Sequence, residues 1–308
     1  MPTATEYFGI SVTNIGPLTT TYTPPPSCTT VTTDHLIYVL QSSLEAAAGP
    51  PDCEIDPVGN CLPSGSAIDS FIKEYNHPKS GQGIHAFHSP GIQCPRGWTT
   101  AAVLAHGDKT GSEVRSGIFT TTVRPNISMP VQMGSDEWWL KVLEPSETLA
   151  WCCPSGWAGN LGGVCRSSIA PALSAGYSSA CYEIVPEDAF VTVHTVDGER
   201  VSDTDGLISL VPYTSYTKET FTMTGRWPEP TFLESLVLAR QVPVVELVYK
   251  AEDVEAAKNG PKEDDDDKDV KGKDDGNAAS ALSNFGGVLS VVALMVGLLT
   301  GAGLLVPW

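Results

Sequence analysis

The eight cysteines of this chain constrain its fold more than any other feature. All of them lie within the first 181 of its 308 residues. An even number of cysteines in a segment rich in turn residues is typical of an oxidised domain that folds outside the cytosol. The connectivity stays open, although short intervening loops favour Cys53–Cys61 and Cys153–Cys165. The disulfide candidates are Cys28, Cys53, Cys61, Cys94, Cys152, Cys153, Cys165 and Cys181.

Two alternatives to disulfides remain. The first is a set of eight reduced, buried thiols. The second is a zinc site, but the sequence has no paired C-x2-C spacing, and the adjacent Cys152 and Cys153 are poorly placed to bind one ion.

Three of the cysteines begin the same short motif, at residues 61–65 (CLPSG), 94–98 (CPRGW) and 153–157 (CPSGW). Proline fixes φ near −65° at one turn position, and glycine two residues later supplies a positive φ, which together predict a type II turn. We expect the cysteine to tether this turn and the tryptophan to pack over it. A role for the two tryptophans in stacking on a substrate is the alternative.

The composition favours short strands. The chain contains 29 glycines and 24 prolines, and neither residue supports long helices. Runs of β-branched and aromatic residues bounded by turn residues predict strands, and Asp197-Gly198 predicts a hairpin. We therefore expect a mainly β, small, irregular, disulfide-stapled antiparallel domain at residues 34–250, open to a split into two subdomains near residue 185. One or two short helices are expected, at 34–48 and 66–75, and strands at 117–123, 148–151, 190–196, 207–211, 220–224 and 244–249.

The C-terminal part has a different composition. Residues 251–276 carry eleven acidic side chains and five lysines, which predicts a disordered, solvated stalk over 251–284. Residues 285–308 contain no charged side chain, so we expect a membrane helix at 285–307. The alternative is a GPI-attachment signal, with Asn277 in the small-residue cluster 276–280 as the attachment site.

The N-terminal residues 1–33 read as a Thr/Pro-rich extended arm. Residues 1–28 contain no lysine or arginine and only a short apolar stretch, which does not fit a secretory signal. For this reason we favour a retained helix over GPI exchange. The lysines that precede the apolar segment favour a cytosolic location for residues 1–284, whereas the cysteines favour the opposite side.

Several segments resemble a known group of proteins. Residues 16–25 (GPLTTTYTPP), 87–99 (FHSPGIQCPRGWT), 152–157 (CCPSGW) and 245–254 occur in the order seen in a group of fungal cysteine-rich surface proteins. This resemblance implies a cysteine-rich domain on the secreted side, followed by one membrane helix, with no assigned activity or catalytic residues. The chain departs from the group in lacking a longer tail after the apolar segment and in its long acidic stalk.

Motifs of catalysis are absent from the sequence. It contains no G-x-S-x-G elbow, P-loop, GxGxxG or HExxH pattern, so we assign no catalytic, cofactor-binding or metal-binding residue and expect no cofactor. His77, His85, His88 and His106 are the histidines that could form a metal site, but exposed loop histidines are the favoured interpretation.

Three further patterns are weak. Residues 203–206 (DTDG) begin like a calcium loop but lack its acidic residue at position 12, so we expect a turn. Residues 137–139 (EWW) look like an exposed aromatic pair that could meet a carbohydrate, with core or interface packing as the favoured alternative. Asn126 begins an N-glycosylation sequon.

These observations together predict a membrane-anchored fungal cell-surface glycoprotein with a structural, adhesive or interaction role. The expected location is the plasma membrane or cell surface, with the cysteine-rich domain outside. The expected partners are the membrane and either cell-wall polysaccharide or other surface proteins. Nucleic acid is excluded because the net charge of −18 repels phosphates. A tail-anchored adaptor facing the cytosol and a surface enzyme are the alternatives.

Overall fold

The computed structural model describes residues 2–29, 35–54, 57–63, 65–75, 83–107, 113–121, 130–201, 205–213, 216–226 and 230–259. The chain divides into two units, Met1–Ala251 and Glu252–Trp308. Among the described residues, no helix combines the length and the apolar character needed to span a bilayer. The expected membrane helix at 285–307, Asn277 and Asn126 all lie outside the described residues.

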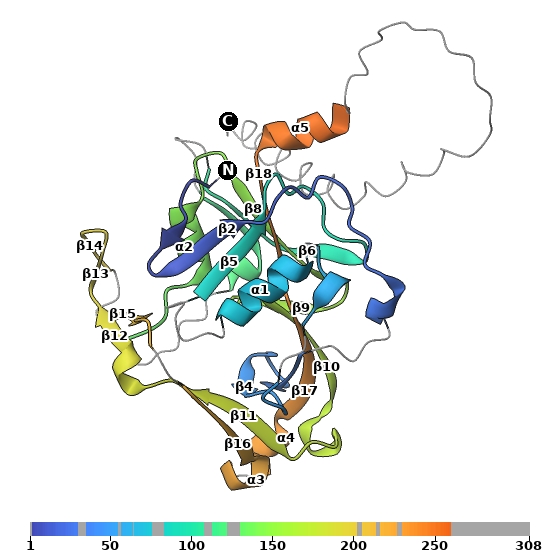
Figure 1. Ribbon diagram of the computed structural model, residues 1–308, viewed down its shortest axis with the longest axis vertical. Coiled ribbons are helices and arrows are strands. Elements are labelled where there is room, and N and C mark those ends of the chain that lie inside the picture. Colours follow the sequence, from blue (N-terminus) through green and yellow to red (C-terminus); the bar gives the residue numbers. More distant parts are fainter. Residues whose placement is uncertain are drawn as a thin grey trace, which may run out of the picture. The chain divides into compact units, whose positions relative to one another are not determined.

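The larger of the two main sheets has seven strands in a mixed arrangement (Figure 1). The pairs β2–β5 and β5–β18 are parallel, and the other neighbours are antiparallel. In spatial order the strands are β1 (Glu6–Tyr7), β2 (Ile10–Asn14), β5 (Gly83–His88), β18 (Val245–Tyr249), β8 (Thr148–Pro154), β6 (Trp98–Ala105) and β7 (Val114–Gly117).

The second main sheet has five strands, all antiparallel. Its order is β4 (Ala46–Ala48), β3 (His35–Leu40), β17 (Leu236–Pro243), β10 (Val164–Pro171) and β9 (Ala158–Asn160). A single residue, Val244, separates β17 from β18, so the chain passes directly from the five-stranded sheet into the seven-stranded one. The backbone N–H of Val244 donates to the carbonyl of Gly163 at 3.0 Å and holds this crossing next to β10.

Three two-stranded ribbons complete the β structure of the described residues, and their strands are labelled in Figure 1. They pair β11 (Ser179–Ile184) with β16 (Thr217–Thr222), β12 (Phe190–Val193) with β15 (Leu207–Leu210), and β13 (Thr195–Val196) with β14 (Glu199–Arg200). The helices are α1 (Gly65–Tyr75), α2 (Ser135–Val142), α3 (Met223–Arg226), α4 (Pro230–Glu234) and α5 (Ala251–Asn259). Short 3-10 turns occupy Pro26–Thr29, Gly59–Cys61, Ile118–Thr120, Ala172–Ser174 and Glu187–Ala189.

The main hydrophobic core lies on one face of the seven-stranded sheet, where α2 covers it. Alternate residues of each strand point to this face, because successive side chains of a strand point to opposite sides. Its largest buried members are Phe87, Leu104, Trp138, Trp139, Leu149 and Trp151. A second core on the five-stranded sheet contains Tyr38, Leu236, Leu238, Met223 and Leu233.

The prediction of a mainly β domain with short helices is confirmed, and so are several of its elements. Strands occur as expected in β8, β15 and β18, and a helix occurs at 65–75. The Asp197-Gly198 hairpin joins β13 and β14, with φ of 50° and 81° at its two central residues. In the CPxGW motifs, Gly97 and Gly156 have φ of 81° and 83°, as a type II turn requires. In the related motif at residues 61–65 (CLPSG), Gly65 instead begins α1.

Two predictions for the N-terminal part are wrong. The helix expected at 34–48 is replaced by β3 and β4. The run Ile37-Tyr38-Val39 pairs with β17, and the side chains of Tyr38 and Val39 are fully buried. The extended arm expected at 1–33 is also wrong, since β2 forms a parallel pair with β5 and buries Val12.

Other boundaries also differ from expectation. A strand is expected to begin at Gly117 and extend to residue 123, but β7 ends at Gly117 and a 3-10 turn follows at Ile118–Thr120. A split near residue 185 is not observed, because one compact unit extends to Ala251. The stalk begins as helix α5, in which Glu252 and Asp253 stand in the first turn and Lys258 in the last, an order that suits the helix dipole.

Candidate functional site

All eight cysteines are paired in the structure, and none is free. The pairs are Cys28–Cys61, Cys53–Cys181, Cys94–Cys152 and Cys153–Cys165. Cys153–Cys165 agrees with the prediction. The predicted Cys53–Cys61 bond is wrong, because folding brings Cys53 to Cys181, a partner 128 residues away that short-loop reasoning does not find.

The adjacent Cys152 and Cys153 form the centre of this framework. Both are buried in β8, and as neighbours in a strand they point to opposite faces of the sheet. Cys152 binds Cys94, which lies just before β6. Cys153 binds Cys165 of β10 within the main core. The second bond therefore joins the seven-stranded sheet covalently to the five-stranded one.

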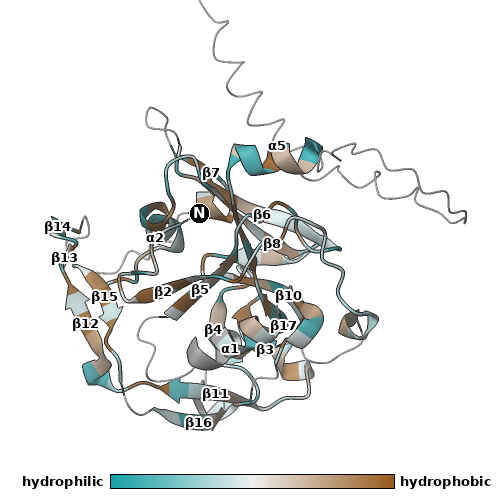
Figure 2. Cartoon of the chain, turned by 45° about the horizontal axis from the view of Figure 1, so that its top comes forward, coloured by the Kyte–Doolittle hydropathy of each residue, from teal (hydrophilic) through white to brown (hydrophobic). Residues whose placement is uncertain are grey.

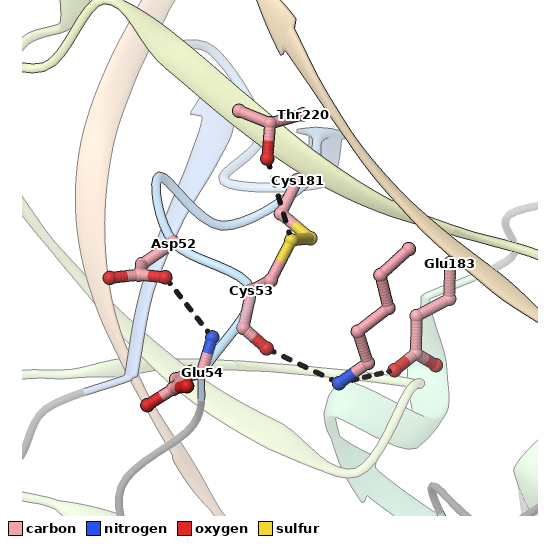
Figure 3. A network of polar contacts seen from close by, with 7 residues as sticks. Asp52, Cys53, Glu54, Cys181, Glu183 and Thr220 are labelled. Carbon is pink, nitrogen blue, oxygen red and sulfur yellow. Dashed lines mark hydrogen bonds and ion pairs between the residues drawn. A yellow bond between two sulfur atoms is a disulfide. The ribbon is translucent and has the colours of Figure 1, made fainter.

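The Cys53–Cys181 bond lies in an exposed polar network (Figure 3). It connects the segment after β4 to the centre of the β11–β16 ribbon, where Cys181 pairs with Thr220. The ammonium group of Lys218 donates to the carbonyl of Cys53 at 3.3 Å and forms an ion pair with Glu183 at 3.2 Å. These contacts fix the ribbon to the first half of the chain.

A histidine and a buried glutamate form a part-buried polar contact, in which the His85 side chain stays 21% exposed. Nδ1 of His85 lies 2.9 Å from Oε1 of Glu246. The two residues come from the neighbouring parallel strands β5 and β18 and share the face covered by α2. Glu246 is only 5% exposed, and its Oε2 has no hydrogen-bond partner among the described residues. A carboxylate in this position needs the imidazole to compensate for the loss of water.

Two tryptophans of α2 pack against His85. The ring of Trp138 stacks on His85 at 4.5 Å, and the ring of Trp139 meets it edge-on at 5.3 Å. Trp138 Nε1 also donates to the carbonyl of Tyr7 at 2.9 Å. The exposed aromatic pair that the sequence suggested is wrong, since Trp138 and Trp139 are 1% and 0% exposed. Core packing, the favoured alternative, is what the structure has.

The histidines considered for a metal site are partly separated in the structure. His85 and His88 are an odd number of residues apart on β5, so their side chains point to opposite faces of the sheet. Neither is an exposed loop residue, contrary to expectation. His106 lies beyond the end of β6, and His77 is outside the described residues. Within the described part of the chain, no three His, Cys, Asp or Glu side chains gather in a way that could hold a metal ion.

His88 occupies a second buried position. Its Nδ1 lies 3.1 Å from the carbonyl of Gly16. Burial lowers the pKa of His88 below its ordinary value, and the hydrogen bond to Gly16 opposes this effect only in part. A neutral imidazole that donates from Nδ1 satisfies the site.

Chemically, a carboxylate that orients an imidazole is one half of an acid–base arrangement. The contacts described for His85 are Glu246 and the two indole rings, and these hold the imidazole rather than offer it a substrate. We interpret the pair as part of the core. Sequence reasoning missed Glu246, although an acidic residue in the middle of the apolar run 244–248 is a signal that could have found it.

Half of the DTDG pattern at 203–206 lies outside the described residues, namely Asp203 and Thr204. Of the other half, Asp205 lies in a turn and Gly206 has a φ of 84° immediately before β15.

We predict that the His85–Glu246 pair behaves as a buried couple. His85→Phe keeps an aromatic ring but leaves the Glu246 carboxylate without a partner, and should lower the free energy of unfolding by about 1–3 kcal/mol, since the 21% exposed site lets water replace part of the contact. The double variant His85→Phe, Glu246→Leu should be more stable than His85→Phe alone. Denaturant midpoints of the wild type and both variants measure this. A double variant less stable than the single one would contradict the pairing.

We also predict a pH dependence from His88. The pKa of His88 is lowered in the folded state, so the unfolded chain takes up a proton near the ordinary pKa of 6.5 while the folded imidazole stays neutral. The stability of the wild type relative to His88→Gln should therefore fall as the pH drops below about 6.5. Unfolding of both proteins between pH 7.5 and 5 tests this, and a difference that stays constant or grows on acidification would show that the sign is wrong.

No family model, curated protein or solved structure matches this chain. The disulfide framework and the buried His85–Glu246 pair are thus the features of the described residues from which a function can be proposed.

Proposed function

We propose that this protein is a membrane-anchored surface protein of fungal type, whose disulfide-bonded β domain has a structural, adhesive or interaction role and no catalytic one. The observation that carries the proposal is the complete pairing of the eight cysteines within the unit Met1–Ala251. Disulfides form and persist in oxidising compartments and are rare in the cytosol. We therefore place this unit on the outer side of the membrane.

The position of the bonds supports a structural need for oxidation. Cys152, Cys153 and Cys165 are fully buried, and Cys153–Cys165 lies inside the main core. Four bonds divided among both main sheets, the β11–β16 ribbon and the N-terminal segment constrain the unfolded chain, which is the usual source of disulfide stabilisation. A domain built in this way suits conditions outside the cell, where no chaperone repairs it.

The anchor in this proposal is the uncharged segment 285–307, joined to the domain through the acidic residues 251–284. The acidic residues repel one another and favour an extended spacer beyond helix α5. Such a spacer would hold the folded domain away from anionic lipid headgroups. The packing of two tryptophans against His85 favours a structural role for the His85–Glu246 pair.

We predict that protease added to intact microsomes will leave the cysteine-rich domain protected, because the domain faces the lumen. An antibody against residues 1–250 should detect a fragment that keeps all four disulfides, and detergent should make the same fragment accessible. If the domain is digested in intact vesicles, it faces the cytosol and the tail-anchored adaptor is the better account.

A further inference from the structure

An open sheet edge next to exposed apolar side chains is the surface that the proposed function does not explain. It belongs to strand β12, whose described partner is β15. Beyond β15, the chain at Val131 forms a parallel bridge to Leu207, so β15 is covered on its other side. Within the described residues, no strand pairs with the outer edge of β12. This edge can accept a further strand.

The register identifies which backbone groups are available. The N–H of Val211 donates to the carbonyl of Ala189, directly opposite it, at 2.9 Å. Hydrogen-bonded pairs alternate along an antiparallel ladder. The backbone N–H and C=O groups of Val191 and Val193 therefore point toward β15, while those of Phe190 and Thr192 point away from it. The N–H of Phe190 is already bonded to Glu187. This leaves the carbonyl of Phe190 and both backbone groups of Thr192 for an incoming chain.

Apolar side chains surround this edge. Phe190 is 49% exposed and Val191 is 37% exposed, one on each face of the strand. Ile184 at the end of β11 and Val211 just after β15 are also exposed. Figure 2 shows hydrophobic stretches on β12 and β15, while the neighbouring β11–β16 ribbon is largely hydrophilic. Long exposed apolar side chains at an unpaired edge are a site for strand addition.

The charges next to the edge select the partner. Residues 183–200 contain five carboxylates and one arginine. Glu183, Glu187, Asp188, Asp197 and Glu199 are all exposed. Lys218 pairs with Glu183 at 3.2 Å and Lys141 lies 3.9 Å from Glu199, so Glu187, Asp188 and Asp197 are the carboxylates of this segment that form no ion pair within the described residues. A second copy of the chain would bring the same acidic segment against this one, and anionic lipid would also be repelled. A segment that alternates lysine or arginine with apolar residues would satisfy both the charges and the apolar faces.

We infer that β12 is the docking site for a cationic, extended segment of a partner protein, which binds by adding a strand at Phe190–Thr192. The inference deepens the proposed interaction role and names the chemistry of the partner. It does not depend on which side of the membrane the domain faces, so its failure would leave the topology proposal intact.

The test uses the full chain in nonionic detergent and three labelled peptides, with binding measured by fluorescence anisotropy. The peptides are an alternating lysine–valine heptamer, the glutamate–valine heptamer of the same length, and the lysine–valine peptide with a central proline. We expect the first peptide to bind at least about tenfold more tightly than the other two, and its affinity to fall as salt is raised. Detergent without protein corrects for binding to micelles.

Two variants locate the site. Thr192→Pro removes an N–H that faces outward, a position where sheets tolerate proline, and should weaken binding of the lysine–valine peptide at least about tenfold. Glu187→Lys with Asp188→Lys should weaken it as well and improve binding of the glutamate peptide. Glu252→Lys with Glu255→Lys makes the same change in net charge outside this unit and should leave binding unaltered.

Three results would overturn the inference. One is equal binding of the acidic and basic peptides, and another is binding that persists in Thr192→Pro. The third is self-association of the wild type that Thr192→Pro abolishes, which would make a second copy the occupant of the edge. Binding of the lysine–valine peptide that is retained in the α5 variant but weakened in Thr192→Pro and in the Glu187→Lys, Asp188→Lys variant supports the inference.

Discussion

The two adjacent cysteines of β8 are the constraint on which the rest of this structure depends. Because neighbouring residues of a strand point to opposite faces, Cys152 and Cys153 can form bonds in opposite directions from one place in the chain. One bond ties β8 to the segment before β6, and the other ties it to β10 of the second sheet. A reduced Cys153 would leave a thiol in the middle of the main core and remove a covalent link between the sheets.

The second link between the sheets is the chain itself, which passes from β17 through Val244 into β18. The disulfide and this crossing lie close together, since Val244 bonds to Gly163 and Cys165 follows two residues later. Strand β18 then carries Glu246 into the face covered by α2. The buried carboxylate is tolerated there because His85 on the next strand is aligned with it and lies within hydrogen-bond distance. The disulfides of β8 and the His85–Glu246 pair thus both depend on how β18 aligns with its two neighbours, β8 and β5.

Local chemistry explains which parts of this fold could be predicted. The Asp197-Gly198 hairpin and the CPxGW turns require positive φ at known positions, so their sequences determine them with no help from the rest of the molecule. The segment 34–48 has leucines at helical spacing, but its pairing with β17, which is about 200 residues away in sequence, overrides that periodicity. Cys53–Cys181 and the His85–Glu246 contact escaped prediction for the same reason. Each depends on contacts between distant segments, and a single sequence carries little information about them.

The measurement that tests this account most directly is the disulfide map of the native protein. Trypsin under non-reducing conditions should release two cross-linked assemblies, one joining residues 1–73 to 167–200 and the other joining residues 80–96 to 142–166. Fragmentation between Cys152 and Cys153 should assign Cys152 to Cys94 and Cys153 to Cys165, with no thiol open to alkylation. Free thiols at Cys152 or Cys153, or a bond that joins residues 1–73 to 142–166, would contradict the account.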